Sequence, residues 1–277
     1  VPAGTQKWNL DLGTQVSSSP LVDAQGNSFF AAGNKFYAYD ASGVKTGELV
    51  LSNEVTAPAA RFGNFVYFGD SNGNLVKVDV SNPASPSKVD ISLSAGQSFE
   101  YNMPAIDCGG NVYIQTADRK LFKVSSAGVK TELLSVADPS SQNGWPVGAT
   151  KTARYASPVV DFVGNRVFTG SQKGVQITNL TGTADTVFLP TTAVDSSGAS
   201  NPATPLDQAI NSPLAIDAAG KGYVVSETGT LYKFDPANPA TPLWQKFVGD
   251  GDAAPVIGSD NTIYIAFSFD IIIEKRY

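Results

Sequence analysis

Carboxylates are the side chains of this sequence best suited to acid–base chemistry. Glu100 and Asp252 each stand shortly before a proline that recurs along the chain, which makes them candidates for a general acid and a general base. The 277 residues include no histidine and a single cysteine, Cys108. This excludes Ser–His and Cys–His nucleophile arrangements, thiolate metal clusters and internal disulfides. The pair of Glu100 and Asp252 belongs to an enzymatic alternative; the main prediction is no catalytic residue, no bound metal and no cofactor.

The charge balance argues against several classes of partner. Asp and Glu number 25 against 19 Lys and Arg, a formal net charge of −6, so there is no basic surface for nucleic acid. No apolar run approaches the roughly 20 residues that span a bilayer, so no membrane span is expected. Few charged residues (16%) and many small polar ones favour an extracytoplasmic protein that is periplasmic, secreted or on the cell surface.

A repeat positions the candidate residues. One phrase returns six times: a proline, a short apolar run, a turn rich in Asp, Gly and Asn, and an aromatic or β-branched strand. The prolines are Pro20, Pro58, Pro104, Pro158, Pro213 and Pro255. In the turns, Gly supplies positive φ and Asp or Asn bonds to its own backbone, so these are hairpin turns. A third, alternating strand and a looser fourth strand follow in the repeats.

Four antiparallel strands in roughly 40 to 50 residues are the size of a propeller blade. We therefore predict an all-β fold, a six-bladed β-propeller over residues 1–277 as a single domain. The blades start near residues 19, 57, 103, 157, 212 and 254.

The sixth unit ends at Tyr277 after only three strands. Residues 6–13, "QKWNLDLG", resemble the fourth strand "PLWQKFVG" at 242–249, and each carries a tryptophan. We expect the N-terminal strand to complete the last blade and close the ring, because an open ring would leave strand edges unpaired. The alternative is that the native chain continues beyond Tyr277.

The repeat also resembles a known family. Residues 212–235, "SPLAIDAAGKGYVVSETGTLYKFD", and residues 57–79, "APAARFGNFVYFGDSNGNLVKVD", are similar to the PQQ-like, quinoprotein-type propeller repeat. The resemblance covers almost the whole chain as a repeat pattern. It implies a propeller fold and a family that holds quinoprotein dehydrogenases together with non-enzymatic relatives.

This sequence departs from the dehydrogenase members of that family. They typically have eight blades, a quinone held with calcium over the channel, and often an adjacent pair of cysteines. Here about six blades and the isolated Cys108 are present. We therefore expect a non-dehydrogenase member.

In a propeller, the loops that precede each first strand and the turns between second and third strands lie at the mouth of the channel. Candidate ligand-binding residues there are Glu54, Glu100, Tyr101, Asn102, Trp145, Arg154, Tyr155, Asn211 and Asp252. Carboxylates, aromatic rings and one arginine suit a polar ligand, a sugar or a peptide. The alternative is that Tyr101 and Tyr155 fill the channel and the charges are only solvated. Two longer connections, residues 137–157 and 190–212, are where insertions with binding roles belong.

Two functions follow from this pattern. The first is a non-catalytic extracytoplasmic module that binds a protein partner or a small polar ligand at the mouth face, as a monomer or as part of a longer chain. The alternative is a carboxylate- or metal-dependent lyase or hydrolase with its site at the same mouth.

Overall fold

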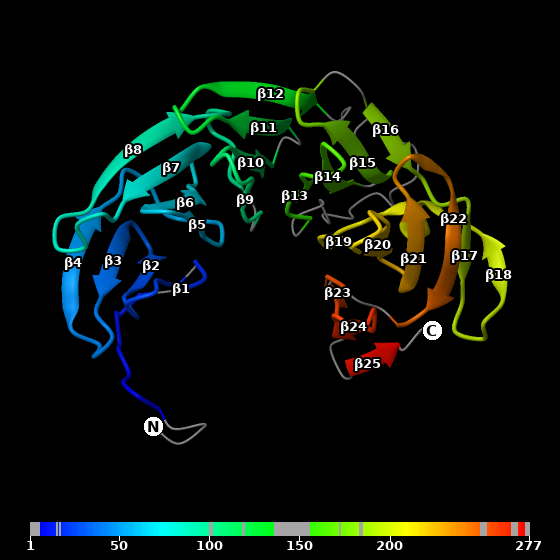
Figure 1. Ribbon diagram of the computed structural model, residues 1–277, viewed down its shortest axis with the longest axis horizontal. Helices are drawn as coiled ribbons and strands as arrows, with labels where there is room; N and C mark the ends of the chain where they lie inside the picture. The colour runs from blue at the N-terminus through cyan, green and yellow to red at the C-terminus, as the bar shows by residue number, and fades with distance from the viewer. Residues whose placement is uncertain are drawn as a thin grey trace. The chain divides into compact units, whose positions relative to one another are not determined.

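Strands make up nearly all of the regular structure in the computed structural model (Figure 1). It describes residues 6–14, 16, 18–99, 102–117, 120–135, 156–171, 173–182, 185–249, 254–266 and 271–274. The one helix in these residues is α1 (Pro205–Gln208), a single turn. Nothing in this described part is a helix long and apolar enough to cross a membrane.

The first sheets follow the repeat, each with its strands in chain order. The first is β1 (Leu21–Val22), β2 (Ser28–Ala32), β3 (Lys35–Tyr39) and β4 (Lys45–Val50). The second is β5 (Ala60–Phe62), β6 (Phe65–Gly69), β7 (Asn74–Asp79) and β8 (Ser87–Ser92). The third is β9 (Ala105–Ile106), β10 (Val112–Gln115), β11 (Lys120–Val124) and β12 (Lys130–Ser135).

The later sheets continue the pattern. The fourth is β13 (Val159–Asp161), β14 (Arg166–Ser171), β15 (Gly174–Asn179) and β16 (Asp185–Phe188). The fifth is β19 (Ala215–Ile216), β20 (Gly222–Val225), β21 (Thr230–Asp235) and β22 (Asn238–Phe247). The last has three described strands, β23 (Val256–Ile257), β24 (Ile263–Ala266) and β25 (Ile271–Glu274). The prediction of an all-β chain built from four-stranded antiparallel sheets is confirmed.

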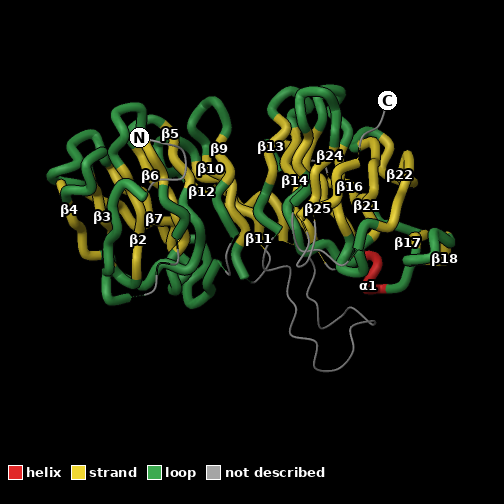
Figure 2. Tube along the Cα trace, turned by 90° about the horizontal axis from the view of Figure 1, so that it is seen from below, coloured by secondary structure: helices red, strands yellow, loops and turns green. Residues whose placement is uncertain are grey.

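An additional hairpin, β17 (Thr192–Val194) and β18 (Ser200–Pro202), stands outside the repeat. It lies in the connection between the fourth and fifth sheets, which residues 190–212 form. The same connection contains α1 (Figure 2). The described strands thus form seven sheets, and the number of blades stays a prediction.

The chain divides into two compact units, residues 1–118 with 124–130, and residues 119–123 with 131–277. The core of the first contains Phe29, Phe36 and Phe68, with the rings of Phe36 and Phe68 stacked 6.2 Å apart. The core of the second contains Phe188 and Phe234, stacked at 4.3 Å. Burial of such rings is the main favourable term for each unit.

The Asp-x-x-Gly turns have the chemistry that the sequence predicts. In the first sheet, Asp23 Oδ1 accepts the amides of Gln25 (2.9 Å) and Asn27 (2.8 Å), and Gly26 has φ +83°. The aspartates at 107 and 217 accept from the same relative positions. The aspartate satisfies amides that the tight turn would otherwise leave unpaired, which explains why the phrase recurs.

The N-terminal segment differs from the expectation. Residues 6–13 do not form a strand; instead the Trp8 ring stacks on Tyr39 at 6.2 Å, and Lys7 Nζ donates to the Ala41 carbonyl at 3.2 Å. Side-chain packing on the first sheet, rather than backbone pairing, holds this segment. Among the described strands, β25 pairs only with β24. The resemblance of residues 6–13 to a fourth strand therefore did not predict their local structure.

Candidate binding site at the proline end of the fifth sheet

Each repeat proline marks one end of its sheet, which we call the proline end. In the fifth sheet, Ala215 pairs with Tyr223 and Thr230 pairs with Phe247. The chain therefore enters β19, turns from β20 to β21 and leaves β22 at the same end. The proline end of the fifth sheet therefore includes the residues just before Pro213, the 226–229 turn and Phe247.

Three of the predicted site residues can be placed. Glu54 is exposed, and its backbone carbonyl accepts the Ser71 amide (2.8 Å) at the proline end of the second sheet. Asn102 is buried and donates from Nδ2 to the Phe99 carbonyl at 3.0 Å. Asn211 is also buried, and its Nδ2 donates to Glu227. In both asparagines the buried Oδ1 has no hydrogen-bond partner.

The other predicted residues lie outside the described residues: Glu100, Tyr101, Trp145, Arg154, Tyr155 and Asp252. The proposed acid–base pair of Glu100 and Asp252 is therefore not tested. Within the described part of the chain, no three His, Cys, Asp or Glu side chains gather in a way that could hold a metal ion.

The connection at residues 190–212 forms a docked substructure. Its hairpin is held on the fifth sheet by Thr230 Oγ1, which accepts the Val194 amide (3.2 Å) and donates to the Val194 carbonyl (3.1 Å). The Tyr232 hydroxyl donates to the Thr192 carbonyl at 3.0 Å. These contacts join the insertion to β21, so its position is fixed by the sheet rather than by the hairpin alone.

The hairpin turn repeats the Asp-x-x-Gly chemistry. Asp195 Oδ1 accepts the amides of Ser197 (2.9 Å) and Ala199 (3.0 Å), and Gly198 has φ +84°. Asp195 Oδ2 accepts the Asn201 side-chain amide at 2.8 Å. The hydrogen bonds from these residues, that of the Ser197 hydroxyl first, hold the pKa of the exposed Asp195 below its ordinary value.

A capping box stabilises the N-terminus of α1. The Thr204 hydroxyl accepts the Asp207 amide, while the Asp207 carboxylate accepts the amide (2.7 Å) and the hydroxyl (2.6 Å) of Thr204. The Thr228 hydroxyl, from the β20–β21 turn, also donates to Asp207. Glu227 adds a backbone bond from its amide to the Ala209 carbonyl at 2.9 Å. The insertion and the turn are therefore bonded to each other.

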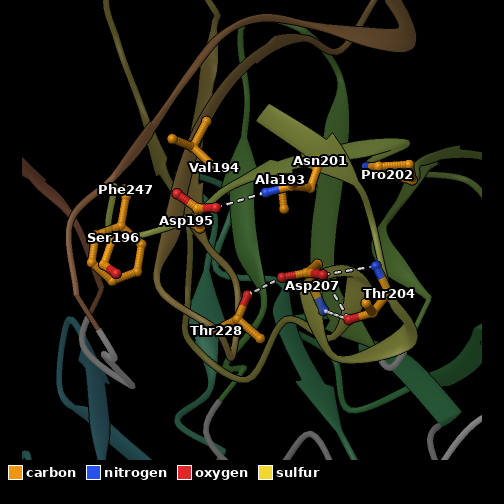
Figure 3. A pocket seen from close by; sticks show the side chains of 10 residues that line it. All are labelled: Ala193, Val194, Asp195, Ser196, Asn201, Pro202, Thr204, Asp207, Thr228 and Phe247. Carbon is orange, nitrogen blue, oxygen red and sulfur yellow. Dashed lines mark hydrogen bonds between the residues drawn. The ribbon is translucent and has the colours of Figure 1, made fainter. Parts of the chain in front are cut away.

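Between the hairpin, α1 and the turn lies a pocket of 320 Å³ (Figure 3). In Figure 3, Asp207 stands between Thr204 and Thr228, and Asp195 reaches toward Asn201. The lining residues are Ala193, Val194, Asp195, Ser196, Asn201, Pro202, Thr204, Asp207, Thr228 and Phe247. The pocket thus combines two carboxylates with hydroxyls, an amide and an aromatic ring.

The pocket lining carries net negative charge. Asp207 is only 9% exposed, and burial alone would raise its pKa. The hydrogen bonds from Thr204 and Thr228 outweigh burial and hold the pKa of Asp207 below its ordinary value. Among the described residues that line the pocket, none is Lys or Arg. Both carboxylates are therefore ionised near neutral pH without a cationic side chain beside them in the lining.

Sequence reasoning located the insertion but not its site residues. Asp195, Asp207, Thr228 and Phe247 were not among the candidates. One local signal was present: "TPLDQ" at 204–208 carries an N-cap threonine, a proline at the first helical position and an acidic residue at the third. The bond from Thr228 to Asp207 spans 21 residues and has no sequence signature.

The chain is similar to known propeller proteins. The LVIVD repeat family matches residues 60–92, which hold strands β5 to β8. Three solved structures are similar in fold: the computationally designed protein Ika8, BamB from Moraxella catarrhalis and a streptogramin B lyase. The chain matches none of the curated protein sequences.

The three structures are similar to this chain in fold over most of its length, but their sequence identities are low. Ika8 is 13% identical with a TM-score of 0.62, over 93% of this chain and 70% of its own. BamB is 14% identical with a TM-score of 0.51, over 96% and 84%. The streptogramin B lyase is 12% identical with a TM-score of 0.50, over 96% and 95%. BamB and the lyase are both β-propeller proteins, and at these identities the likeness is one of fold: an all-β, propeller-like architecture built from repeats.

Proposed function

We propose that this protein is a non-catalytic, extracytoplasmic β-propeller module that binds a small polar ligand or a protein partner at the proline ends of its sheets. The observation that carries the proposal is the pocket at the fifth sheet, because the chain adds an insertion there that the repeat does not need. Insertions on a rigid repeat scaffold are where binding function commonly lies. We propose this pocket as the principal ligand-binding site.

The proposal includes the wider architecture expected from the sequence. It takes the chain as one domain of six blades with PQQ-like repeats, a monomer or part of a longer protein. The proline-end residues Glu54, Asn102 and Asn211 belong to the proposed binding face, together with Glu100, Tyr101, Trp145, Arg154, Tyr155 and Asp252. The proposed ring closure through residues 6–13 requires that segment to leave Tyr39 and pair as a strand.

The state of the pocket carboxylates favours binding over acid–base catalysis. A general acid or base works best when its pKa lies near the operating pH. Hydrogen bonds instead lower the pKa of both Asp195 and Asp207. Such groups remain charged near neutral pH, and charged groups of this kind hold a ligand better than they shuttle its protons. The lyase or hydrolase alternative has no comparable support in the described residues.

A pocket-filling variant tests this proposal. Ser196 lines the pocket and is exposed, so Ser196→Trp places an indole there without burying a new group in the core. Ala24→Trp is the matched control, because Ala24 is exposed and also follows the aspartate of an Asp-x-x-Gly turn. The measurement is ligand-observed NMR with a fragment set containing cationic, neutral and anionic members.

We expect fragments that bind the native protein and the Ala24→Trp variant but lose binding to Ser196→Trp. Binding that survives Ser196→Trp unchanged would contradict the pocket as the site. An absence of any fragment that discriminates the two variants would count against the proposed function itself.

A further inference from the structure

We infer that the pocket at the fifth sheet takes a small organic cation, a ligand that carries a primary ammonium or a guanidinium group. This inference rests on the proposed function, which makes the pocket a binding site. It adds the chemical class of the ligand. The hydrogen atoms of the pocket's polar side chains determine which ligand it can take.

The side-chain donors of the lining other than Ser196 are already directed at its carboxylates. The hydroxyls of Thr204 and Thr228 both donate to Asp207. The side-chain amide of Asn201 donates to Asp195 at 2.8 Å and to the Ala199 carbonyl at 3.4 Å. A hydroxyl has one hydrogen and an amide nitrogen two, so these groups have none left for a ligand. Asp195 Oδ1 already accepts three hydrogen bonds and Asp207 Oδ2 two. The acceptor positions that remain lie on Asp195 Oδ2, Asp207 Oδ1, the Asn201 side-chain oxygen and the Thr228 hydroxyl, which is 3.2 Å from the Ser226 hydroxyl.

A wall of acceptors selects a ligand rich in donors. An ammonium offers three N–H groups and no acceptor, and a guanidinium five. Each hydroxyl of a neutral polyol has two acceptor lone pairs for one O–H donor. In the lining, Ser196 supplies the hydroxyl that could donate to such a ligand. A carboxylate or phosphate ligand would find acceptors opposite its own acceptors. The hydrogen-bond complement is therefore that of a cation.

The charge of the pocket and its apolar wall also favour an organic cation. Two ionised carboxylates without a cationic neighbour in the lining attract a positive ligand and repel an anion. Phe247, Val194 and Pro202 supply apolar surface for the carbon chain, and an aromatic face also attracts a cation. The volume of 320 Å³ is at the low end of small-molecule sites, roughly 300–1,000 Å³, so the ligand is small.

Three probes of equal length separate the classes: 1,4-diaminobutane, 1,4-butanediol and succinate, each titrated by isothermal calorimetry at low salt. We expect the diamine to bind at least about ten-fold more tightly than the diol, and succinate not to bind. Asp195→Asn should weaken the diamine about ten-fold, since asparagine can keep the turn while losing the charge. Asp207→Asn should do the same.

Asp40→Asn is the matched control. Asp40 accepts the amides of Ser42 and Val44 in the same type of turn as Asp195, but it lies in the first sheet and lines no part of this pocket. It removes the same charge, so its diamine affinity should equal that of the native protein. Circular dichroism of each variant confirms that it is folded.

The outcomes separate the two proposals. If the diol or succinate binds best and Ser196→Trp abolishes that binding, the cation inference is wrong and the pocket remains a binding site. If the diamine binds equally to Asp195→Asn, Asp207→Asn and Asp40→Asn, it senses only the net charge of the chain, and the inference is overturned. If no probe binds and no fragment is lost with Ser196→Trp, the proposed function fails as well.

Discussion

The β6–β7 turn of the second sheet and the β20–β21 turn of the fifth stand at equivalent places, yet their polar groups are satisfied differently. In the second sheet, Asp70 is 1% exposed and lies within the turn. Its Oδ1 accepts the amides of Asn72 (2.9 Å) and Asn74 (2.8 Å). Its Oδ2 accepts the side-chain amides of Asn53 and Asn74, both at 2.8 Å. We call this the closed turn, because its carboxylate belongs to the turn itself; one of the donors, Asn53, comes from the connection before β5.

In the fifth sheet, a serine takes the place of that aspartate. Ser226 Oγ accepts the Thr230 amide at 3.1 Å, the bond that corresponds to the one from the Asn74 amide to Asp70. The carboxylate comes instead from the insertion, as Asp207 bonds to Thr228. The carboxylate supplied from outside this turn lines the pocket together with Thr228. The same turn is therefore structural in the second sheet and part of a candidate site in the fifth, depending on which segment supplies its carboxylate.

The largest effect should come from breaking the closed turn. Asp70→Ala removes four hydrogen bonds to a buried carboxylate and leaves their donors unpaired, so we expect a loss of about 3 kcal/mol in the free energy of unfolding. Asp40→Ala removes two bonds at a more exposed turn and should cost about 1 kcal/mol. Urea denaturation measures both, and equal losses would contradict the assigned role of Asp70.

A smaller and more local effect is expected at the fifth sheet. Asp207→Ala removes the capping box of α1 and the bond to Thr228, a loss of about 2 kcal/mol that falls mainly on the insertion. Hydrogen exchange should speed up at the Glu227 amide, which bonds to the Ala209 carbonyl. The Asn74 amide of the closed turn should keep its protection. Equal acceleration at both amides would mean that the insertion and the second sheet are not independent.

The smallest expected effect is a change in how stability depends on pH at the fifth sheet. Because the pKa of Asp207 is lower in the folded state than in the unfolded state, its charged form stabilises the fold above about pH 4. That stabilisation is lost as the pH falls through the folded-state pKa. Thr228→Val removes one hydrogen bond that lowers this pKa, so the pKa should rise and about 1 kcal/mol of stability at neutral pH should be lost.

The acid side of the stability profile checks this result. In the Thr228→Val variant the decline of stability between neutral pH and pH 3 should be shallower than in the native protein. Thr228→Ser keeps the hydroxyl and should retain the native profile. If the serine variant behaves like the valine variant, the methyl group of Thr228 rather than its hydroxyl is responsible.

Local chemistry explains what the sequence could predict. Each Asp-x-x-Gly turn is set by residues within five positions, so the hairpins, the strands beside them and the sheets follow from the sequence. Residues 6–13 show the limit: they have the alternation of a fourth strand, but Trp8 packs on Tyr39 instead. Strand pairing depends on a partner edge, which a sequence pattern alone does not specify.

The site was less predictable for the same reason. The insertion at 190–212 stood out by its length, and the candidate Asn211 lies near its end. The pocket, however, depends on the bonds from Thr228 to Asp207 and from Thr230 to Val194, which join residues far apart in the chain. Candidates chosen for their position before a proline, such as Glu54, could not include a carboxylate delivered by a capped helical turn.

The most direct test of the account is to map amide chemical shifts as 1,4-diaminobutane is added to the full chain. We predict saturable shifts at Asp195, Asn201, Asp207 and Thr228, and none at Asn72 or Asn74 of the closed turn. Asp195→Asn should move the midpoint of these shifts to higher diamine concentration. Shifts at Asn72 as large as those at Thr228, or none at the pocket residues, would contradict the claim that the insertion turns a structural turn into a binding site.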